Sequence, residues 1–168
     1  MEEKFTLKIK DTFKDMVAFQ FYNSYYKMKG VMNIVISAGC LALYLSGYIS
    51  GIKWMEWLLI FGALFFPIIY PLVLVLKAAV AAYGGKAKEP IQYTFSHEGI
   101  NIFQNDNTLD LAWKDLFFVK ETKSTMYIYI TPSSALILPY NQIYGYGANI
   151  KNLLNKHMDN ARIKYVKS

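Results

Sequence analysis

His97 and Glu98 are the residues best suited to chemistry, because an imidazole and a carboxylate stand side by side in the chain. General acid–base catalysis needs such a pair to be positioned against a bound substrate. Here the pair lies within Ser96-His97-Glu98-Gly99, a composition that predicts a tight turn with glycine at a positive φ. The other histidine, His157, falls on the apolar side of a predicted helix. We therefore predict an exposed turn at His97 and Glu98 and a packed histidine at position 157.

Metal ligands and nucleophiles are sparse in the sequence. The two histidines and the single cysteine, Cys40, lack the spacing of a structural zinc site. Asp106, Asp110 and Asp115 are spread over a predicted turn and strand, which favours a solvated face over a metal-binding loop. Ser133-Ser134 is not embedded in the G-x-S-x-G pattern of an activated serine.

Two glycine-containing segments are candidate anion sites. Gly84-Gly85-Lys86 lacks the spacing of a phosphate-binding loop. Gly145-Tyr146-Gly147 leads into a predicted helix, where free backbone N–H groups can meet an anion, but a flexible lead-in is the favoured interpretation. We predict that the protein is not an enzyme, and we expect no catalytic, cofactor-binding or metal-binding residue and no cofactor.

Trp113, in the element Trp113-Lys114-Asp115-Leu116, has requirements that restrict where it can lie in the fold. A buried tryptophan fills a large volume, and its indole N–H needs a hydrogen-bond acceptor. We predict that Trp113 anchors a core rather than forming part of a binding surface.

Two apolar runs dominate the elements around these residues. Gly30 to Ile52 and Trp57 to Leu76 contain no charged residue, and only Lys53-Trp54-Met55-Glu56 separates them. A helix needs about 20 apolar residues to cross the core of a bilayer. We therefore predict a transmembrane helical hairpin over residues 30–83, with Trp54 and Trp57 at the outer interface.

The placement of lysines predicts the orientation of this hairpin. Three lysines lie shortly before the first apolar run and three shortly after the second, whereas the linker offers only Lys53. Because positive residues stay on the cytoplasmic side, both termini should be cytoplasmic. The net charge of +6 comes without an arginine cluster, so we expect contact with the head groups of a lipid bilayer rather than with nucleic acid. The six flanking lysines are Lys14, Lys27, Lys29, Lys77, Lys86 and Lys88.

Glycines and prolines mark the two predicted spans. Gly47 and Gly51 are four residues apart, which predicts a shared helix face for close packing within the chain, with a dimer contact as the alternative. Pro67 and Pro71 each remove a backbone donor, which predicts a kink near residues 65–71. Neither run contains an ionisable side chain of the kind that ion pathways use, so a plain kink is favoured over a transport site.

Polar segments flank the predicted hairpin on both sides. Within residues 1–29, Phe5 to Lys10 alternates apolar and polar, which predicts a strand that is followed by an interfacial helix. Tyr22, Tyr25 and Tyr26 suit an aromatic belt at the membrane surface. Since both flanks are expected on the same side of the membrane, we predict that this first strand joins the sheet formed later in the chain.

Residues 91–160 are predicted to form an antiparallel sandwich or barrel, so the fold class is α+β. A helix is predicted over Asn149 to Asn160, and residues 161–168 form a basic tail. With Phe5 to Ile9 included, the count is seven strands and one C-terminal helix, as in a pleckstrin-homology-like domain. The six later strands are predicted at Ile91–Phe95, Ile100–Phe103, Thr108–Trp113, Phe117–Lys120, Met126–Ile130 and Ala135–Leu138.

The chain resembles the YcxB-like family of bacterial membrane proteins in the order of these elements and in three short motifs. The resemblance implies a pleckstrin-homology-like domain anchored in the bacterial inner membrane, and it lends no active site. Family members often carry a basic residue directly after the proline of the third motif. Tyr140-Asn141 follows here instead, which weakens the case for an anionic ligand at that position. The motifs are Tyr93-Thr94-Phe95-Ser96-His97-Glu98-Gly99-Ile100, Trp113-Lys114-Asp115-Leu116 and Leu136-Ile137-Leu138-Pro139.

Three functions are compatible with these features. The leading hypothesis is a non-enzymatic, multi-pass membrane protein whose cytoplasmic domain binds a protein or peptide along an exposed sheet edge. The alternative is a small transporter or channel component that acts as an oligomer, because two spans cannot enclose a pathway alone. An enzyme acting on lipid would need a reactive group at the interface, and His97 and Glu98 are its best candidates.

Overall fold

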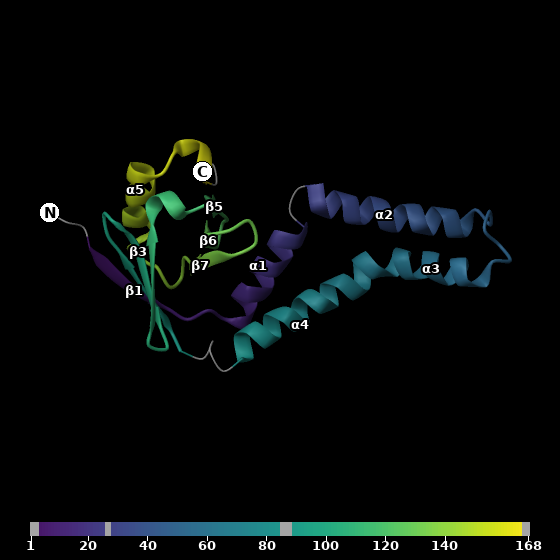
Figure 1. Cartoon of the computed structure of the whole chain (residues 1–168), viewed down its shortest axis with the longest axis horizontal. Coiled ribbons are helices and arrows are strands. Elements are labelled where there is room, and N and C mark those ends of the chain that lie inside the picture. The colour runs from purple at the N-terminus through teal and green to yellow at the C-terminus, as the bar shows by residue number, and fades with distance from the viewer. Residues whose placement is uncertain (1–3, 26–27, 85–88, 166–168) are drawn as a thin grey trace. The chain divides into compact units, whose positions relative to one another are not determined.

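The computed structural model describes residues 4–25, 28–84 and 89–165 of the chain (Figure 1). Contacts within the chain divide it into two units, Met1–Asp15 with Tyr83–Ser168 and Met16–Ala82. Every β-strand lies in the first unit, while the second holds most of the apolar helical sequence. The predicted α+β class is thereby confirmed. Five residues that entered the sequence predictions lie outside the described ranges, namely Tyr26, Lys27, Gly85, Lys86 and Lys88.

The first sheet joins segments from both flanks of the apolar helices. Its strand order is β1-β2-β3-β4, and every neighbouring pair is antiparallel. Phe5 of β1 lies opposite Phe95 of β2, and Ile9 lies opposite Ile91. The prediction that the first strand joins the later sheet is therefore confirmed. The strands are β1 (Phe5–Ile9), β2 (Ile91–Phe95), β3 (Gly99–Gln104) and β4 (Asn107–Ala112).

The two faces of this sheet differ in polarity, because successive side chains of a strand point to opposite faces. Polar side chains meet across the outer face, where Thr6 Oγ1 lies 3.0 Å from Thr94 Oγ1 and Asn101 Nδ2 donates to Asp110 Oδ1 over 2.6 Å. Apolar side chains pair across the inner face. One inner row runs through Phe5, Phe95, Ile100 and Leu111.

The second sheet has the order β7-β6-β5-β8. The last strand, β8, pairs parallel with β5 and falls within the predicted basic tail of residues 161–168. The tail prediction is therefore wrong at residues 163–164, and two residues are too few for a periodic pattern to reveal a strand. The strands are β5 (Phe118–Glu121), β6 (Thr125–Tyr129), β7 (Ala135–Pro139) and β8 (Ile163–Lys164).

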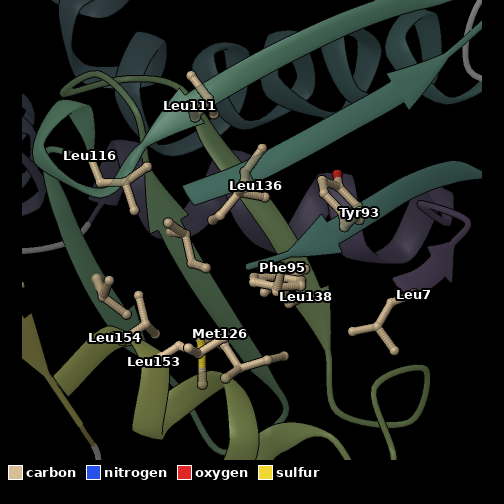
Figure 2. Packing of buried hydrophobic residues seen from close by; sticks show 14 of the residues in the cluster. Leu7, Tyr93, Phe95, Leu111, Leu116, Met126, Leu136, Leu138, Leu153 and Leu154 are labelled. Carbon is tan, nitrogen blue, oxygen red and sulfur yellow. The ribbon is translucent and has the colours of Figure 1, made fainter. Parts of the chain in front are cut away.

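One hydrophobic core joins both sheets to the C-terminal helix α5 (Gly147–His157) (Figure 2). The helix contributes Ile150, Leu153 and Leu154, which are fully buried or nearly so. They recur at helical spacing, so one face of α5 is apolar and packs on the sheets. Figure 2 shows Leu153 and Leu154 beside Met126 of β6. The predicted helix is confirmed, although it ends at His157, three residues before Asn160.

The second unit contains most of α1 (Phe13–Tyr25), followed by α2 (Met28–Leu45) and a long helix with an internal π-helical turn. The long helix runs over Lys53–Tyr83, with 31 residues and a hydropathy of 2.6, so it is long and apolar enough to cross a membrane. A second candidate span exists only if α1 and α2, which are strongly bent against each other, are counted together. Helices α2 and α3 contact each other and lie side by side (Figure 1). The segments of the long helix are α3 (Lys53–Leu64), η1 (Phe65–Ile69) and α4 (Tyr70–Tyr83).

The connection between α2 and α3 differs from the prediction. Lys53 to Glu56 forms the first turn of α3, and the chain reverses within residues 46–52. Gly47 and Gly51 lie in this reversal with φ values of +67° and +98°, in the left-handed region that favours glycine. They do not form a helix face, so the predicted packing role of this glycine pair is wrong.

Gly62 of α3 takes the packing role that the sequence analysis assigned to Gly47 and Gly51. A Cβ atom at position 62 would lie 2.8 Å from Cys40 Sγ of α2, closer than such atoms approach in proteins. The absence of a side chain at Gly62 therefore allows α2 and α3 to approach closely at this level, as small residues do between apolar helices.

A Gly62→Leu substitution is expected to lower the free energy of unfolding by about 1–3 kcal/mol, the usual penalty for overpacking. Gly39→Leu is the matched control, because a Cβ atom at position 39 of α2 would meet nothing within 4 Å. Thermal unfolding in detergent micelles, followed by circular dichroism, measures both variants. Equal melting temperatures for the two variants would show that the close approach at Gly62 is wrong.

The predicted break at Pro67 and Pro71 is confirmed as the π-helical turn η1, and the helix axis changes direction between α3 and α4 (Figure 1). In this turn the N–H of Tyr70 donates to the carbonyl of Phe65, five residues back. With the same five-residue spacing, the carbonyl of Phe66 would accept a hydrogen bond from the backbone nitrogen of Pro71. Proline has no N–H, so this hydrogen bond cannot form. The hydroxyl of Tyr25 donates to Phe66 O instead, over 2.8 Å. This contact replaces the hydrogen bond that the proline removes.

Candidate functional site

The two histidines lie together in the structure, although 60 positions separate them in the sequence. Nδ1 of His97 lies 3.3 Å from Nε2 of His157, and the rings meet edge to face. Both side chains are half-buried, whereas the neighbouring Glu98 is exposed. The predicted exposed turn is therefore correct for Glu98 and wrong for His97, because His97 is covered in part by α5.

Trp113 holds both histidines in place. Its ring stacks on the imidazole of His157, with the ring centroids 5.6 Å apart and the planes within 9°. Its indole Nε1 donates to the carbonyl oxygens of Ser96 and His97, at 3.1 and 3.0 Å. Since Trp113 is only 5% exposed, the predictions of a core anchor at Trp113 and of a packed His157 are both confirmed.

The turn that carries His97 depends on its flanking residues. Ser96 N donates to Gly99 O over 3.0 Å, and Glu98 N donates to Ser96 Oγ over 3.3 Å. Gly99 has φ +156°, and a Cβ atom there would lie 2.0 Å from the carbonyl oxygen of Leu111 on β4. Glycine is therefore required where the turn enters β3, because this backbone passes too close to β4 for a side chain.

The surroundings of His157 disfavour the charged form of its imidazole. Burial, followed by the neighbouring His97 and Lys156, lowers the pKa of His157. A neutral imidazole has one nitrogen with a free electron pair, so it can accept a hydrogen bond or bind a metal ion. Within the described part of the chain, neither imidazole is hydrogen-bonded to a carboxylate that would poise it for acid–base catalysis.

A second polar cluster is built around Glu121, at the end of β5. Lys151 of α5 places its Nζ 2.6 Å from Glu121 Oε1, and the hydroxyl of Tyr140 donates to the same oxygen. The ammonium group of Lys151 also lies 5.0 Å from the centre of the Tyr165 ring. Glu121 is 8% exposed and the Lys151 side chain is half-buried, so this partly buried ion pair joins the second sheet to α5.

The tyrosines of this cluster are held in their neutral form. Burial and then the Glu121 charge raise the pKa of Tyr165 to about 12. Burial and the hydrogen bond to Glu121 raise the pKa of Tyr140. Tyr140 stands directly after Pro139, where the resembled family often has a basic residue, and it faces a carboxylate.

Both polar clusters are built mainly from one stretch of the chain. Residues 95–157 match the YcxB-like protein family. The resemblance expected from the sequence motifs is therefore confirmed for this part of the chain, the YcxB-like segment. No curated protein matches the chain.

The YcxB-like segment contains both histidines, Trp113, Glu121 and Lys151. Strand β1 and the apolar helices lie before this segment in the sequence and are not part of the match. Short motifs revealed the segment, whereas the pairing of His97 with His157 and of Glu121 with Lys151 left no local signal. Both pairs depend on contacts between α5 and strands far away in the sequence.

Among the remaining candidate residues, Asp110 and Asp115 line one open pocket together with Glu98, whereas the serine turn, Gly145 and Asp106 lie outside it. Ser133 and Ser134 form a turn in which both backbone N–H groups donate to Thr131 Oγ1. Gly145 has φ +86° and leads into α5, and Asp106 occupies a turn between β3 and β4. Within residues 4–25, 28–84 and 89–165, no three side chains of His, Cys, Asp or Glu come together as metal ligands.

A half-buried carboxyl group with one buried oxygen lies outside the YcxB-like segment, at Asp11 between β1 and α1. Burial, followed by the charge of Asp15, raises the pKa of Asp11 to about 6. Among the residues that the structure describes, Asp11 Oδ1 has no hydrogen-bond partner. Asp15 itself accepts hydrogen bonds from the backbone and hydroxyl of Thr12, at 3.2 and 2.5 Å, and so caps the start of α1.

Asp11 is expected to make the protein less stable as the pH rises. The folded state binds the proton of Asp11 more tightly than the unfolded state, whose pKa is near 3.8. The free energy of unfolding should therefore fall between about pH 4 and pH 6 and then level off, by about 2–3 kcal/mol in total. Asp11→Asn should remove this fall and be the more stable protein above pH 6. Denaturation in detergent across this pH range measures the free energy of unfolding of both proteins. If Asp11→Asn shows the same pH dependence as the unchanged protein, the prediction is wrong.

Proposed function

We propose that the protein is a non-enzymatic integral membrane protein that presents a pleckstrin-homology-like interaction domain at the cytoplasmic face of the bacterial inner membrane. The pairing of β1 with β2 carries this proposal. One strand precedes the apolar helices and the other follows them, so the helices are an insertion within one folded unit.

The same pairing supports a hairpin with two crossings. A chain that crosses a membrane once leaves its flanks on opposite sides, where β1 and β2 could not pair. An even number of crossings is therefore needed, and the long helix over Lys53–Tyr83 supplies one of them. The second crossing then belongs to α2, which lies beside α3 and is largely exposed along its apolar length. Exposure to lipid is the ordinary condition for such a surface.

The charge distribution supports a cytoplasmic location for the strand-containing unit. Lys14 of α1 and Lys77 of α4 lie near the two ends of the helical insertion in the sequence, and Lys53 begins α3 at the opposite end of the hairpin. Positive residues are enriched on the cytoplasmic side. Strands β1 to β7 and helix α5 match the number and order of elements in a pleckstrin-homology-like domain. Strand β8 is additional to this set.

The edge at β4 is the surface best suited to a protein partner. Strand β4 pairs on one side only, with β3, so its other side offers unpaired backbone groups. Two large apolar side chains are exposed near this edge, Leu109 of β4 at 52% and Phe103 of the neighbouring β3 at 42%. An extended peptide can add to such an edge through main-chain hydrogen bonds, while alternate side chains provide specificity.

A photo-crosslinking amino acid at Thr108 of β4 tests the proposal in intact cells. Thr108 is exposed and lies opposite Phe103, so a partner at this edge should form a protein adduct there. Tyr144 is the matched control, because it is 91% exposed and lies far from β4 in the sequence, before α5. Protein adducts at Thr108 and not at Tyr144 would support the proposal. Adducts to lipid alone, or none at either position, would contradict it.

The alternative function, an oligomeric transporter or channel component, has one supporting observation. A cavity of about 280 Å³ lies between α2 and the π-helical turn η1. Asn33 and Ser37 bring polar groups to its wall, and π-helical turns often occur at functional sites. The other motivation, a helix face formed by Gly47 and Gly51, does not exist in the structure. A strictly monomeric mass in native membranes would exclude this alternative.

A further inference from the structure

We propose that His97 and His157 together bind one divalent transition-metal ion that prefers imidazole nitrogen, such as Zn²⁺, Ni²⁺ or Cu²⁺. This inference goes beyond the proposed function. It rests on the geometry of the histidine pair and does not depend on how the chain crosses a membrane. The ligands are Nδ1 of His97 and Nε2 of His157.

The distance between the two nitrogens suits a shared ion. Zinc binds histidine nitrogen at about 2.0–2.1 Å, so two nitrogens at a tetrahedral angle lie about 3.3–3.4 Å apart. The observed separation between Nδ1 of His97 and Nε2 of His157 is 3.3 Å. The same separation also allows a hydrogen bond in which one imidazole N–H donates to the nitrogen of the other ring. A bound ion would replace this hydrogen bond, because each ring then carries its proton on its other nitrogen and directs a free electron pair at the metal.

The surrounding residues hold the two ligands before any ion arrives. The Trp113 ring stacks on the imidazole of His157. Its indole N–H donates to the carbonyl oxygens of Ser96 and His97 and so holds the backbone of the turn that carries His97. The outer residues that orient metal-binding imidazoles commonly influence metal affinity. A preorganised pair loses little conformational freedom when it binds.

The position of the pair also suits a cation. His157 is the last residue of α5, an eleven-residue helix whose C-terminal end carries partial negative charge. Both imidazoles are half-buried, so solvent can supply the remaining ligands. Lys156, a neighbour in α5, is exposed and positive, and it opposes the ion. Two neutral nitrogens do not suit Mg²⁺ or Ca²⁺, which prefer oxygen ligands.

The test uses the full-length protein in detergent, purified without a histidine tag and titrated with ZnCl₂ by calorimetry. One zinc ion per chain is expected to bind. His97→Gln and His157→Gln should each weaken the affinity by roughly tenfold or more, because each removes one arm of a two-point attachment. Lys156→Gln is the control, since it changes the neighbouring charge and removes no ligand; its affinity should be equal to or above that of the unchanged protein.

A second measurement needs no substitution in the site. Nitrogen-15 spectra of the imidazoles should shift for both His97 and His157 at one equivalent of Zn²⁺. The proposal is overturned if neither ring responds at millimolar zinc. It is also overturned if the stoichiometric affinity survives in both His→Gln variants, because the ion would then bind elsewhere on the chain.

Discussion

Lys151→Met is expected to lower the free energy of unfolding by about 1–3 kcal/mol, since the buried Glu121 carboxylate loses the ammonium group that it contacts. Lys151 Nζ lies 2.6 Å from Glu121 Oε1, and Glu121 is 8% exposed. The substitution keeps the length of the side chain and removes its charge. Tyr140 would remain hydrogen-bonded to the carboxylate but cannot neutralise it.

Lys156→Met is the matched control for this prediction, because Lys156 occupies the same helix and is exposed. It should change the free energy of unfolding by no more than about 0.5 kcal/mol, as is usual at exposed positions. Replacing Glu121 by Gln together with Lys151→Met should restore part of the loss, because no charge then remains buried at the site. Denaturation in detergent, followed by the circular dichroism of the strands, compares the variants. Equal stability of Lys151→Met and Lys156→Met would contradict the partly buried ion pair.

Gly99→Ala is expected to lower the free energy of unfolding by about 2–4 kcal/mol, in the range of mutations that force a change in the backbone. The added Cβ atom would lie 2.0 Å from the carbonyl oxygen of Leu111, a contact that side-chain rotation cannot relieve. Either β4 or the turn at residues 96–99 must then move. Because that turn carries His97, the variant should also separate His97 from His157.

Gly147→Ala is the matched control, because its Cβ atom would meet only the ring of Tyr140, at an ordinary 3.5 Å. It lies at the start of α5, where alanine is the better helix former, so its stability should be unchanged or slightly increased. Thermal unfolding measures the loss, and imidazole chemical shifts report the separation of the histidines. A Gly99→Ala protein as stable as Gly147→Ala would show that β3 and β4 do not approach as closely as described.

The strands were predictable because their signal is local. Ile91 to Phe95 alternates apolar and polar residues, and turn residues bound it on both sides, so the period of two identifies a half-buried strand. The pairing of β1 with β2 is not local, yet it was predictable from the two apolar runs, because a hairpin of two predicted spans would return the chain to its starting side. The two-residue strand β8 was missed, since it is too short to show a period.

The errors occurred where backbone geometry or distant contacts decide the structure. The spacing of Gly47 and Gly51 is the same on a helix and in a loop, and only their positive φ values distinguish the two. The close approach of α2 at Gly62 could not be predicted from the residues around Gly62. It depends on Cys40, which lies on another helix. The contact between His97 and His157 likewise depends on how α5 packs on the sheets.

The π-helical turn illustrates a partial success. Pro67 and Pro71 predicted a break, because each removes a backbone donor. The sequence offered no way to foresee that the helix would continue through a π-helical turn, or that Tyr25 of α1 would supply the hydrogen bond to Phe66. Such a replacement is expected wherever water is excluded, since an unpaired carbonyl there is destabilising.

A disulfide between β1 and β2 tests the central claim most directly, namely that one folded unit is interrupted by the apolar helices. Thr6→Cys and Thr94→Cys, in a chain with Cys40→Ala, place two cysteines at paired positions where the native hydroxyls are 3.0 Å apart. A protease site inserted within residues 46–52 allows the chain to be cut between α2 and α3. Isolated membranes are oxidised with diamide, treated with the protease, and analysed with and without reductant.

The two fragments are expected to stay joined until reductant is added. Thr6→Cys with Asp110→Cys is the control, because β1 and β4 are the opposite edges of the same sheet. Three strand spacings separate them, about 14 Å, which exceeds the reach of a disulfide. Fragments that separate without reductant in the Thr6–Thr94 pair, after complete oxidation, would contradict the claim that the first strand completes the sheet.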